Sequence, residues 1–491
     1  MKYTKEVKIT SGLIRGYIDD NSGVSIFKGI PYGKAPVGEL RLKPTIEVDP
    51  WEGVKDCVTF GPSAIQEEQK PFMFWSEEFV IGDYGYSEDC LNLNIWANDD
   101  GNAKKPVIVY FHGGRFVSGG SSCENYDGTA FAKNGIVFLS FNHRVATLAQ
   151  LSTKELFEES GGMNSGNYNL MDAICVLNWV QKNIKEFGGD PANVTLMGQS
   201  SGAGEVNALT VCDRAKGLYK RALSLSYNSY IGNIADIGWK ELEDAFLQGT
   251  EVTDGKSLDE IRKMPATDFT IKAPIDTMRV DNNYLKAQFK ELVDSGLNKD
   301  TDFVFGAVPG DWLICSPFYH KKTETKEDVI TYLKEFFGDA YEKAAEYYDI
   351  ENNIKEKLIP IINNDYIVSC MLLYAKARNK FNSGKTYLYF YKHILPGPEN
   401  GAYGVFHSSE LPYFFNYFTD KRAEYFTDKD FELGKKINDI MSDYAKGVSL
   451  EKYGWKPTTG TNYFLIEDDG LREVFFDEEL LKLYEYGFNR K

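Results

Sequence analysis

Apolar runs of strand length recur along the first two-thirds of the chain. Residues 106–111 (PVIVYF) and 136–141 (IVFLSF) are almost entirely apolar. Continuous runs of this kind are typical of central strands that are buried on both faces, because a strand with one wet face alternates instead. A shorter run, residues 194–197 (VTLM), predicts a third strand.

Helical spacing separates these runs. Between residues 168 and 187, apolar side chains recur three, four or seven positions apart, which places them on one face of a helix. They are Leu170, Ile174, Leu177, Ile184 and Phe187. Residues 188–191 (GGDP) predict the end of that helix, because two glycines and a proline do not continue it. The alternation predicts an α/β fold with a large, mostly parallel central sheet and helices on both faces.

The second half of the chain is more polar and more helical. Residues 302–305 (DFVF) and 386–391 (TYLYFY) predict two more strands, each leading into a loop. Helical stretches occupy residues 241–248, 328–337 and 341–348. The sequence contains no internal repeat, low-complexity tract or linker. We therefore expect one domain over residues 1–491, with a mainly helical insertion at about 235–385.

Charge excludes some partners. The 55 basic and 72 acidic residues give a net charge of −17, which argues against nucleic acids and anionic membranes, since both are bound by clustered Lys and Arg. The lysine pairs at residues 104–105 and 321–322 are interpreted as solvated surface. The apolar runs are far shorter than a membrane span. We expect neither nucleic acid nor a membrane as a partner.

The cysteines indicate a reducing compartment. Seven are scattered along the chain without a C-x-x-C motif, and the first residues lack the apolar core of a signal peptide. We expect a cytoplasmic protein, although a chain that had lost an export signal would look the same. The thiols of Cys123, Cys175 and Cys315 are interpreted as small buried hydrophobic groups rather than as nucleophiles.

The most informative motif is G-x-S-x-G at residues 198–202. Such a run arises by chance about 0.3 times in a chain with 44 glycines, so its context decides. Here the predicted strand 194–197 leads directly into it, and a helix is expected to start near Ala203. A serine on so tight a turn has its hydroxyl exposed, which suits Ser200 to attack a carbonyl. An ordinary turn serine is the structural alternative.

A serine nucleophile needs a base and an acid. His407 lies in a Gly/Pro-rich loop beyond the strand 386–391, and Asp311 lies in the loop after the strand 302–305. The chain order Ser200, Asp311, His407 is that of a hydrolase triad on an α/β sheet. A plain loop carboxylate and a loop histidine remain the alternatives for Asp311 and His407.

The other histidines suggest no further chemistry. His112 ends a strand in His-Gly-Gly, where the backbone of the loop is more useful than the ring, so we interpret this side chain as structural. His143, His320 and His393 are interpreted as surface or packing residues, since nothing near them has metal-ligand spacing. We expect no metal and no cofactor.

Four further blocks of sequence are distinctive: residues 27–41 (FKGIPYGKAPVGELR), 87–94 (SEDCLNLN), 166–172 (GNYNLMD) and 183–191 (NIKEFGGDP). They resemble blocks of the type-B carboxylesterases, the family of para-nitrobenzyl esterases, animal carboxylesterases and cholinesterases. With the serine motif they run from residue 27 to residue 202 in the family's order, and Asp311 and His407 follow. The resemblance implies an α/β-hydrolase fold.

The resemblance also implies roles for single residues. Ser200 matches the family's nucleophile, Asp311 its acid and His407 its base. The oxyanion donors it implies are the backbone N–H groups of Gly114, Arg115 and Ser201.

Outside the reacting groups, Arg41 and Glu88 match a structural ion pair of the family.

Several positions depart from the family pattern. Arg115 replaces a glycine or alanine, and we expect its guanidinium either to restrict bulky acyl groups or to attract an acidic or carbonyl-bearing one. Ser201 replaces an alanine, and Gln199 replaces a glutamate, which weakens any case for cationic substrates. Tyr227 replaces a glycine and is expected to narrow the pocket.

One further departure concerns a disulfide. Ala64 stands where many secreted members carry the cysteine that pairs with the one matching Cys90. The resemblance therefore implies that this bridge is absent, which favours the cytoplasm.

The function implied is a serine carboxylesterase that transfers the acyl group of a small or medium ester, aryl esters included, through an acyl-enzyme. Its partner is a small-molecule ester, and the chain is a monomer or a homodimer. One alternative is a non-catalytic, cholinesterase-like binding protein, which typically lacks the nucleophile. The other is a lipase, which the acidic composition and the lack of an apolar lid make less favourable.

Overall fold

The computed structural model describes residues 1–490 apart from residues 73–74, 102–103, 164, 232–237, 272–273, 312–324, 382, 398–403 and 469. The chain divides into two compact units. Unit 1 comprises Met1–Leu223, Trp239–Gln288 and Leu411–Ser449. Unit 2 comprises Ser224–Gly238, Phe289–Glu410 and Leu450–Lys491.

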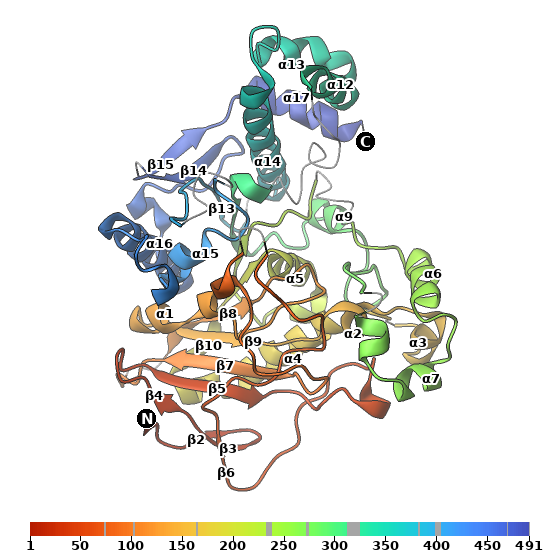
Figure 1. The fold of residues 1–491 in the computed structure, drawn as a ribbon, viewed down its shortest axis with the longest axis vertical. Helices are drawn as coiled ribbons and strands as arrows, with labels where there is room; N and C mark the ends of the chain where they lie inside the picture. Colours follow the sequence, from red (N-terminus) through yellow and green to blue (C-terminus); the bar gives the residue numbers. More distant parts are fainter. Residues whose placement is uncertain are drawn as a thin grey trace. The chain divides into compact units, whose positions relative to one another are not determined.

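A large sheet forms the centre of unit 1 (Figure 1). Its strands, in spatial order, are β1 (Lys2–Tyr3), β4 (Tyr17–Ile18), β5 (Ser25–Pro31), β7 (Asn92–Ala97), β9 (Val137–Phe141), β8 (Lys105–Phe111), β10 (Gly189–Gln199) and β11 (Arg221–Leu225). The β9–β8–β10 pairs are parallel, and the pairs from β1 to β9 are antiparallel. A separate small sheet has the order β2 (Val7–Ile9), β3 (Gly12–Arg15) and β6 (Val54–Asp56).

The parallel centre of this sheet is dry. Every residue of β9 is buried, and Val107, Val109 and Phe111 of β8 have no exposed surface. Such strands need cover on both faces, which is what their unbroken apolar sequence predicts.

The expectation that residues 104–105 are solvated surface was wrong at Lys105. Because β8 starts there, the side chain is only 6% exposed, and its ammonium lies 2.6 Å from a carboxylate oxygen of Asp100. Residues 321–322 lie outside the described part of the chain.

Helices make up much of the rest of unit 1. They are α1 (Thr129–Lys133), α2 (Ala146–Gln150), α3 (Lys154–Glu159), α4 (Tyr168–Asn183), α5 (Ser201–Thr210), α6 (Leu242–Val252), α7 (Leu258–Lys263), α8 (Thr267–Thr270), α15 (Leu411–Phe415) and α16 (Asp428–Lys446). Short 3-10 turns are η1 (Gly38–Leu40), η2 (Glu77–Phe79), η3 (Glu124–Tyr126), η4 (Ile184–Phe187), η5 (Asp213–Ala215) and η8 (Asp420–Arg422). The predicted helix 168–187 is thus α4 continued by η4, and it ends where Gly188 adopts a φ of +78°.

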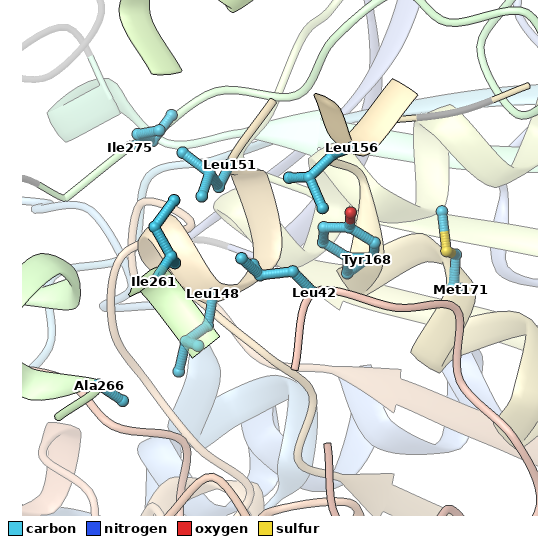
Figure 2. Packing of buried hydrophobic residues seen from close by; sticks show 9 residues of the cluster. All are labelled: Leu42, Leu148, Leu151, Leu156, Tyr168, Met171, Ile261, Ala266 and Ile275. Atoms are coloured by element: carbon cyan, nitrogen blue, oxygen red, sulfur yellow. The ribbon is translucent and has the colours of Figure 1, made fainter. Parts of the chain in front are cut away.

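A buried apolar cluster holds the segment around residue 275 against α2, α3, α4 and α7 (Figure 2). Its members are Leu42, Leu148, Leu151, Leu156, Tyr168, Met171, Ile261, Ala266 and Ile275. Next to this cluster, the expected ion pair forms: the guanidinium of Arg41 binds both carboxylate oxygens of Glu88 at 2.7 Å. Its remaining nitrogen donates to the carbonyls of Ile261 and Met264 at 2.7 and 2.6 Å.

Unit 2 contains strands in the order β12 (Asp302–Ala307), β13 (Thr386–Tyr391), β14 (Asn462–Glu467) and β15 (Gly470–Phe475). The first three run parallel, and β15 pairs antiparallel with β14. Its helices are α9 (Phe289–Asp294), α12 (Lys326–Phe337), α13 (Tyr341–Tyr347), α14 (Lys355–Asn379) and α17 (Glu478–Asn489), with 3-10 turns η6 (Pro309–Asp311), η7 (Gly338–Ala340) and η9 (Leu450–Tyr453). The strand predicted at 386–391 is β13, residue for residue.

Helix α14 is the longest in the described chain, at 25 residues. Among the residues described, it alone is long and apolar enough to cross a membrane by length and composition, but 72% of that apolar window is buried inside the protein. Burial of this kind is the usual property of a core helix. It packs on β12 and β13 and supplies the apolar cover that two parallel strands require.

The predicted α/β fold with a large, mostly parallel central sheet is confirmed. In each unit the parallel pairs are neighbours, and the antiparallel pairs lie toward one edge. The described residues between 235 and 385 form mainly helices, and they also include the strand β12. That residues 1–491 make a single domain with this insertion stays a prediction.

Candidate active site

Ser200 occupies a strained turn between a strand and a helix. Strand β10 ends at Gln199, helix α5 begins at Ser201, and Ser200 between them has φ +56° and ψ −130°. Residues other than glycine rarely adopt this backbone conformation, and such strain persists only where the surrounding structure imposes it. The geometry is that of a nucleophile elbow, in which the hydroxyl stands clear of the backbone.

The two glycines of the motif are required by close backbone contacts. A Cβ on Gly198 would lie 2.4 Å from the carbonyl oxygen of Gly202. A Cβ on Gly202 would lie 2.2 Å from the carbonyl oxygen of Phe111, at the end of β8. Real Cβ atoms do not approach backbone so closely. The elbow therefore turns this tightly only because both positions lack a side chain.

The loop that follows β8 lies against the elbow. A Cβ on Gly113 would come within 3.0 Å of the Cβ of Ser200. The next three residues, Gly114, Arg115 and Phe116, have φ values of +129°, +56° and +62°. The described part of the chain offers no acceptor for the backbone N–H groups of Gly114 and Arg115.

These are two of the N–H groups that the family resemblance implies as oxyanion donors, a role that stays a prediction. The N–H of Ser201 is a third, because Ser201 opens α5 and the first N–H groups of a helix have no acceptor within it. Unpaired N–H groups beside a serine can stabilise the negative charge of a tetrahedral intermediate.

Behind the elbow lies a buried polar cluster. His112 stacks on His143 with ring centroids 4.2 Å apart, and the His112 Nδ1 lies 2.9 Å from the carbonyl oxygen of Gly113. Burial, and secondarily the neighbouring His143, lowers the pKa of His112 well below its usual value, so the ring is neutral. His112 therefore supports the loop, as the sequence suggested. His143 is buried as well, which identifies it as a packing residue rather than a surface one.

Glu205, on α5, belongs to the same cluster. Its carboxylate accepts a hydrogen bond of 2.8 Å from the Asn169 side chain and lies 3.6 Å from Nε2 of His143. Burial raises the pKa of this carboxyl group. No motif in the sequence singled out Glu205; its only signal is a charged residue in an otherwise small and apolar helix.

In unit 2 the predicted acid and base meet. The Oδ1 of Asp311 and the Nδ1 of His407 are 2.6 Å apart, and both residues are buried. The other carboxylate oxygen of Asp311 accepts a hydrogen bond of 3.0 Å from the Val308 N–H. Gly310 allows this approach, because a Cβ there would lie 2.4 Å from the Cα of Phe406.

The pair defines the electrostatics of His407. Burial disfavours the imidazolium and would lower the pKa of His407, but the hydrogen bond and charge of Asp311, assisted by the charge of Glu410, outweigh it. The net pKa is raised above the usual value for histidine. With Nδ1–H donated to the carboxylate, Nε2 is the nitrogen that can take up a proton.

Glu410 is a buried acid close to this pair, and sequence reasoning did not single it out. It is fully buried, and its Oε1 accepts a hydrogen bond of 3.0 Å from the hydroxyl of Ser226. Burial, and then the charge of Asp311, raises the pKa of Glu410 to about 7. The one signal in the sequence was its position three residues after His407. The chemistry of a triad does not require an acid there, so this position gave no reason to select Glu410.

Tyr227 lines a cavity within unit 2. The walls come from the residues after β11, from the end of β12, from Asp311 and from one face of α14. They are Ser226, Tyr227, Asn228, Gly306, Ala307, Asp311, Tyr366, Ile367, Cys370 and Met371. The expectation that Tyr227 narrows the substrate pocket stays a prediction.

The structure thus gathers the candidate residues into two groups. Gly114, Arg115, Ser200 and Ser201 belong to unit 1 and surround the elbow, and Asp311 and His407 form one buried pair in unit 2. That the two groups act together stays a prediction.

Six free cysteines are buried: Cys57, Cys90, Cys123, Cys175, Cys212 and Cys370. Burial raises the thiol pKa of Cys123 and of Cys175 to about 12. These thiols stay protonated at neutral pH, which agrees with their interpretation as packing residues. Cys315 and His320 lie outside the described residues.

A strand, a strained serine and a helix, placed beside parallel strands, define the α/β-hydrolase class. Residues 3–471 match the carboxylesterase family, and the chain belongs to that family. It is 28% identical to the crystal protein of Dictyostelium discoideum over 93% of this chain and 86% of that protein. It is 28% identical to the para-nitrobenzyl esterase of Bacillus subtilis (strain 168) over 90% of each. A solved structure of PNB esterase matches 98% of this chain and 99% of its own, with 25% identity and a TM-score of 0.80.

Proposed function

We propose that this protein is a serine carboxylesterase that hydrolyses small to medium carboxylic esters, aryl esters included, through an acyl-enzyme. The observation that supports this most strongly is the buried hydrogen bond of 2.6 Å between Asp311 and His407. This hydrogen bond orients His407 as a base. The order Ser200, Asp311, His407 along the chain is the one that accompanies a serine elbow in α/β hydrolases. Family membership supports ester hydrolysis as the reaction.

In the first step, Nε2 of His407 takes the proton of the Ser200 hydroxyl as its oxygen attacks the ester carbonyl. Asp311 stabilises the imidazolium that forms and holds the ring in the required tautomer. The carbonyl oxygen becomes an oxyanion, which the N–H groups of Gly114, Arg115 and Ser201 receive. Each such donor contributes about 2.7–4 kcal/mol to the stability of the transition state.

In the second step, the alcohol leaves with the proton held by His407, and the acyl group stays on Ser200. Water then gives a proton to His407 and attacks the acyl carbonyl. Collapse of the second oxyanion releases the carboxylic acid and returns the proton to Ser200. The ester bond is cleaved, and no redox change or cofactor takes part in these steps.

The test is the hydrolysis of p-nitrophenyl butyrate by the wild type and by Ser200→Ala, His407→Ala and Asp311→Asn. Removal of the nucleophile or of the base is expected to lower kcat about 10⁶-fold, and Asp311→Asn about 10⁴-fold. The triple variant is expected to be no slower than Ser200→Ala, since the three residues act as a unit. An inactive wild type would favour the binding-protein alternative, and activity confined to long-chain emulsions would favour the lipase.

A further inference from the structure

The side chain of Arg115 is exposed although its backbone belongs to the oxyanion loop. The side chain is 75% exposed, and the one hydrogen-bonding partner of its guanidinium in the described structure is Asp276, 3.5 Å from Nη2 to Oδ2. Asp276 is itself 51% exposed. The chain thus places a solvent-facing cation beside the group that binds developing negative charge.

The backbone segments that carry Arg115 and Asp276 are both held in place by the surrounding structure. The carbonyl of Gly114 accepts hydrogen bonds from the N–H groups of Val117 and Ser118 at 3.1 and 3.0 Å. Phe116 is buried, and its carbonyl accepts a bond of 2.6 Å from the N–H of Ala146, where α2 begins. Backbone motion of the loop is therefore restricted, and the freedom that remains is in the Arg115 side chain.

Asp276 is fixed in the same way, through its neighbour in the chain. Ile275 has no exposed surface and packs in the apolar cluster of Figure 2, with Leu148 and Leu151 of the α2 region. The backbone on each side of the Arg115–Asp276 pair is thus anchored in the core of unit 1.

The pair itself is weak. Exposed ion pairs stabilise a protein by about 0–1 kcal/mol, and this one is at the long end of hydrogen-bonding distance. A ligand carboxylate that binds the guanidinium with both oxygens makes a stronger, directional contact. Such a ligand can displace Asp276 with little loss of stability.

The overall charge of the protein makes a local cation matter. With a net charge of −17, the protein repels anionic molecules at long range. An anionic ester therefore needs a positive group at the site if it is to compete with a neutral one. Arg115 is a cation whose own N–H is a candidate oxyanion donor.

We propose that Arg115 determines substrate specificity by binding a carboxylate carried by the ester, several atoms away from the scissile carbonyl. The separation follows from the side chain, whose guanidinium lies several bonds from the N–H that receives the oxyanion. Half-esters of dicarboxylic acids of adipate length have this chemistry in the acyl part. Carboxyaryl esters have it in the alcohol part. The inference rests on the proposed esterase function and specifies its substrate class.

The experiment compares matched anionic and neutral esters. Mono(4-nitrophenyl) adipate and 4-nitrophenyl hexanoate test the acyl part, and 4-carboxyphenyl hexanoate and phenyl hexanoate test the alcohol part. The readout is the ratio of kcat/KM for the anionic ester to that for the neutral ester. Each variant is compared with the wild type, so differences in intrinsic reactivity cancel.

Arg115→Ala and Arg115→Gln are expected to lower this ratio about tenfold for one of the two pairs, mainly through a higher KM, and Arg115→Lys is expected to restore part of it. Asp276→Asn is expected to raise the ratio. Arg15→Ala removes an equal surface charge that pairs with Asp56 and is expected to leave the ratio unchanged.

A ratio within twofold of wild type in Arg115→Ala for both pairs would overturn the proposal. An equal drop in Arg15→Ala would also overturn it, since net charge rather than position would then be responsible. A wild type that hydrolyses neither neutral ester would instead refute the esterase function, so the two failures are distinguishable.

Discussion

The buried hydrogen bond between Asp311 and His407 makes a specific statement about pH. The general base must be neutral to take a proton, and its pKa is raised by Asp311 despite burial. Activity is therefore lost as the pH falls through a value higher than that of an ordinary imidazole, about 6.5.

The measurement is the pH profile of kcat/KM for a neutral ester. In Asp311→Asn the carboxylate charge is gone, and the remaining burial is expected to move the inflection to lower pH in the residual activity. A flat profile between pH 5 and 8 would contradict the assignment of His407 as the base.

Glu410 leads to a prediction about stability. Its pKa is about 7 in the folded protein, above the value of about 4.5 expected when it is unfolded. The unfolded state thus releases this proton first as the pH rises, and the folded state is progressively destabilised between pH 4.5 and 7, by about 3 kcal/mol in all.

Glu410→Gln keeps an acceptor for the Ser226 hydroxyl and removes the charge. The free energy of unfolding of this variant, relative to wild type, is expected to increase from pH 5 to pH 8 in urea titrations. Glu410→Ala is the comparison, since it also loses the hydrogen bond. A difference between Glu410→Gln and wild type that does not change with pH would show that Glu410 is not a buried, titrating acid.

Single residues differ in how far their sequence context reveals them. Ser200 was predictable because its motif occupies five consecutive residues directly after an apolar run. The contact of Gly198 lies within that turn, whereas the contact of Gly202 with Phe111 of β8 could not be read from the motif. Asp311 and His407 were predictable as residues of loops that follow parallel strands. Glu205 and Glu410 were not, because burial of a carboxyl group depends on segments far away in the chain.

At the scale of elements, the elbow depends on how closely α5 approaches β8. The contact is between backbones: a Cβ on Gly202 would lie 2.2 Å from the Phe111 carbonyl, so neither partner can rotate away. Gly202→Ala is expected to destabilise the protein by about 1–3 kcal/mol, the usual range for overpacking, and to displace Ser200.

Thermal unfolding and p-nitrophenyl butyrate hydrolysis measure the two effects. Gly23→Ala is the control, since a Cβ on Gly23, whose φ is +75°, would meet no atom within 4 Å. It is expected to lower stability by about 1 kcal/mol through backbone strain alone and to leave activity intact. Equal loss of activity in both variants would refute a specific role for the contact.

Elements with a distinct pattern were predicted well, and those without one were not. The strands β8, β9 and β13 have unbroken apolar sequences, and α4 has clear helical spacing. Helix α14 lies within the predicted helical insertion, but its bounds were not predicted, because it is largely buried and its apolar residues follow no single stripe. Lys105 was misassigned because β8 begins one residue earlier than its apolar run suggests.

At the scale of the whole molecule, sequence blocks within residues 27–202 predicted the α/β-hydrolase fold, and the match to residues 3–471 shows the family. Local pattern could not predict two compact units, since each is assembled from three separate segments of the chain. Nor could it predict the substrate, because the walls of a pocket come from side chains of several elements, as the cavity beside Tyr227 illustrates.

The central claim is that Ser200 becomes acylated with the help of His407. The most direct measurement is mass spectrometry of the intact protein, followed by peptide mapping, after treatment with a slowly hydrolysed fluorophosphonate ester. The wild type is expected to gain one adduct on Ser200, Ser200→Ala none, and His407→Ala an adduct only after far longer exposure. An adduct on another residue, or equal labelling rates with and without the imidazole of His407, would contradict it.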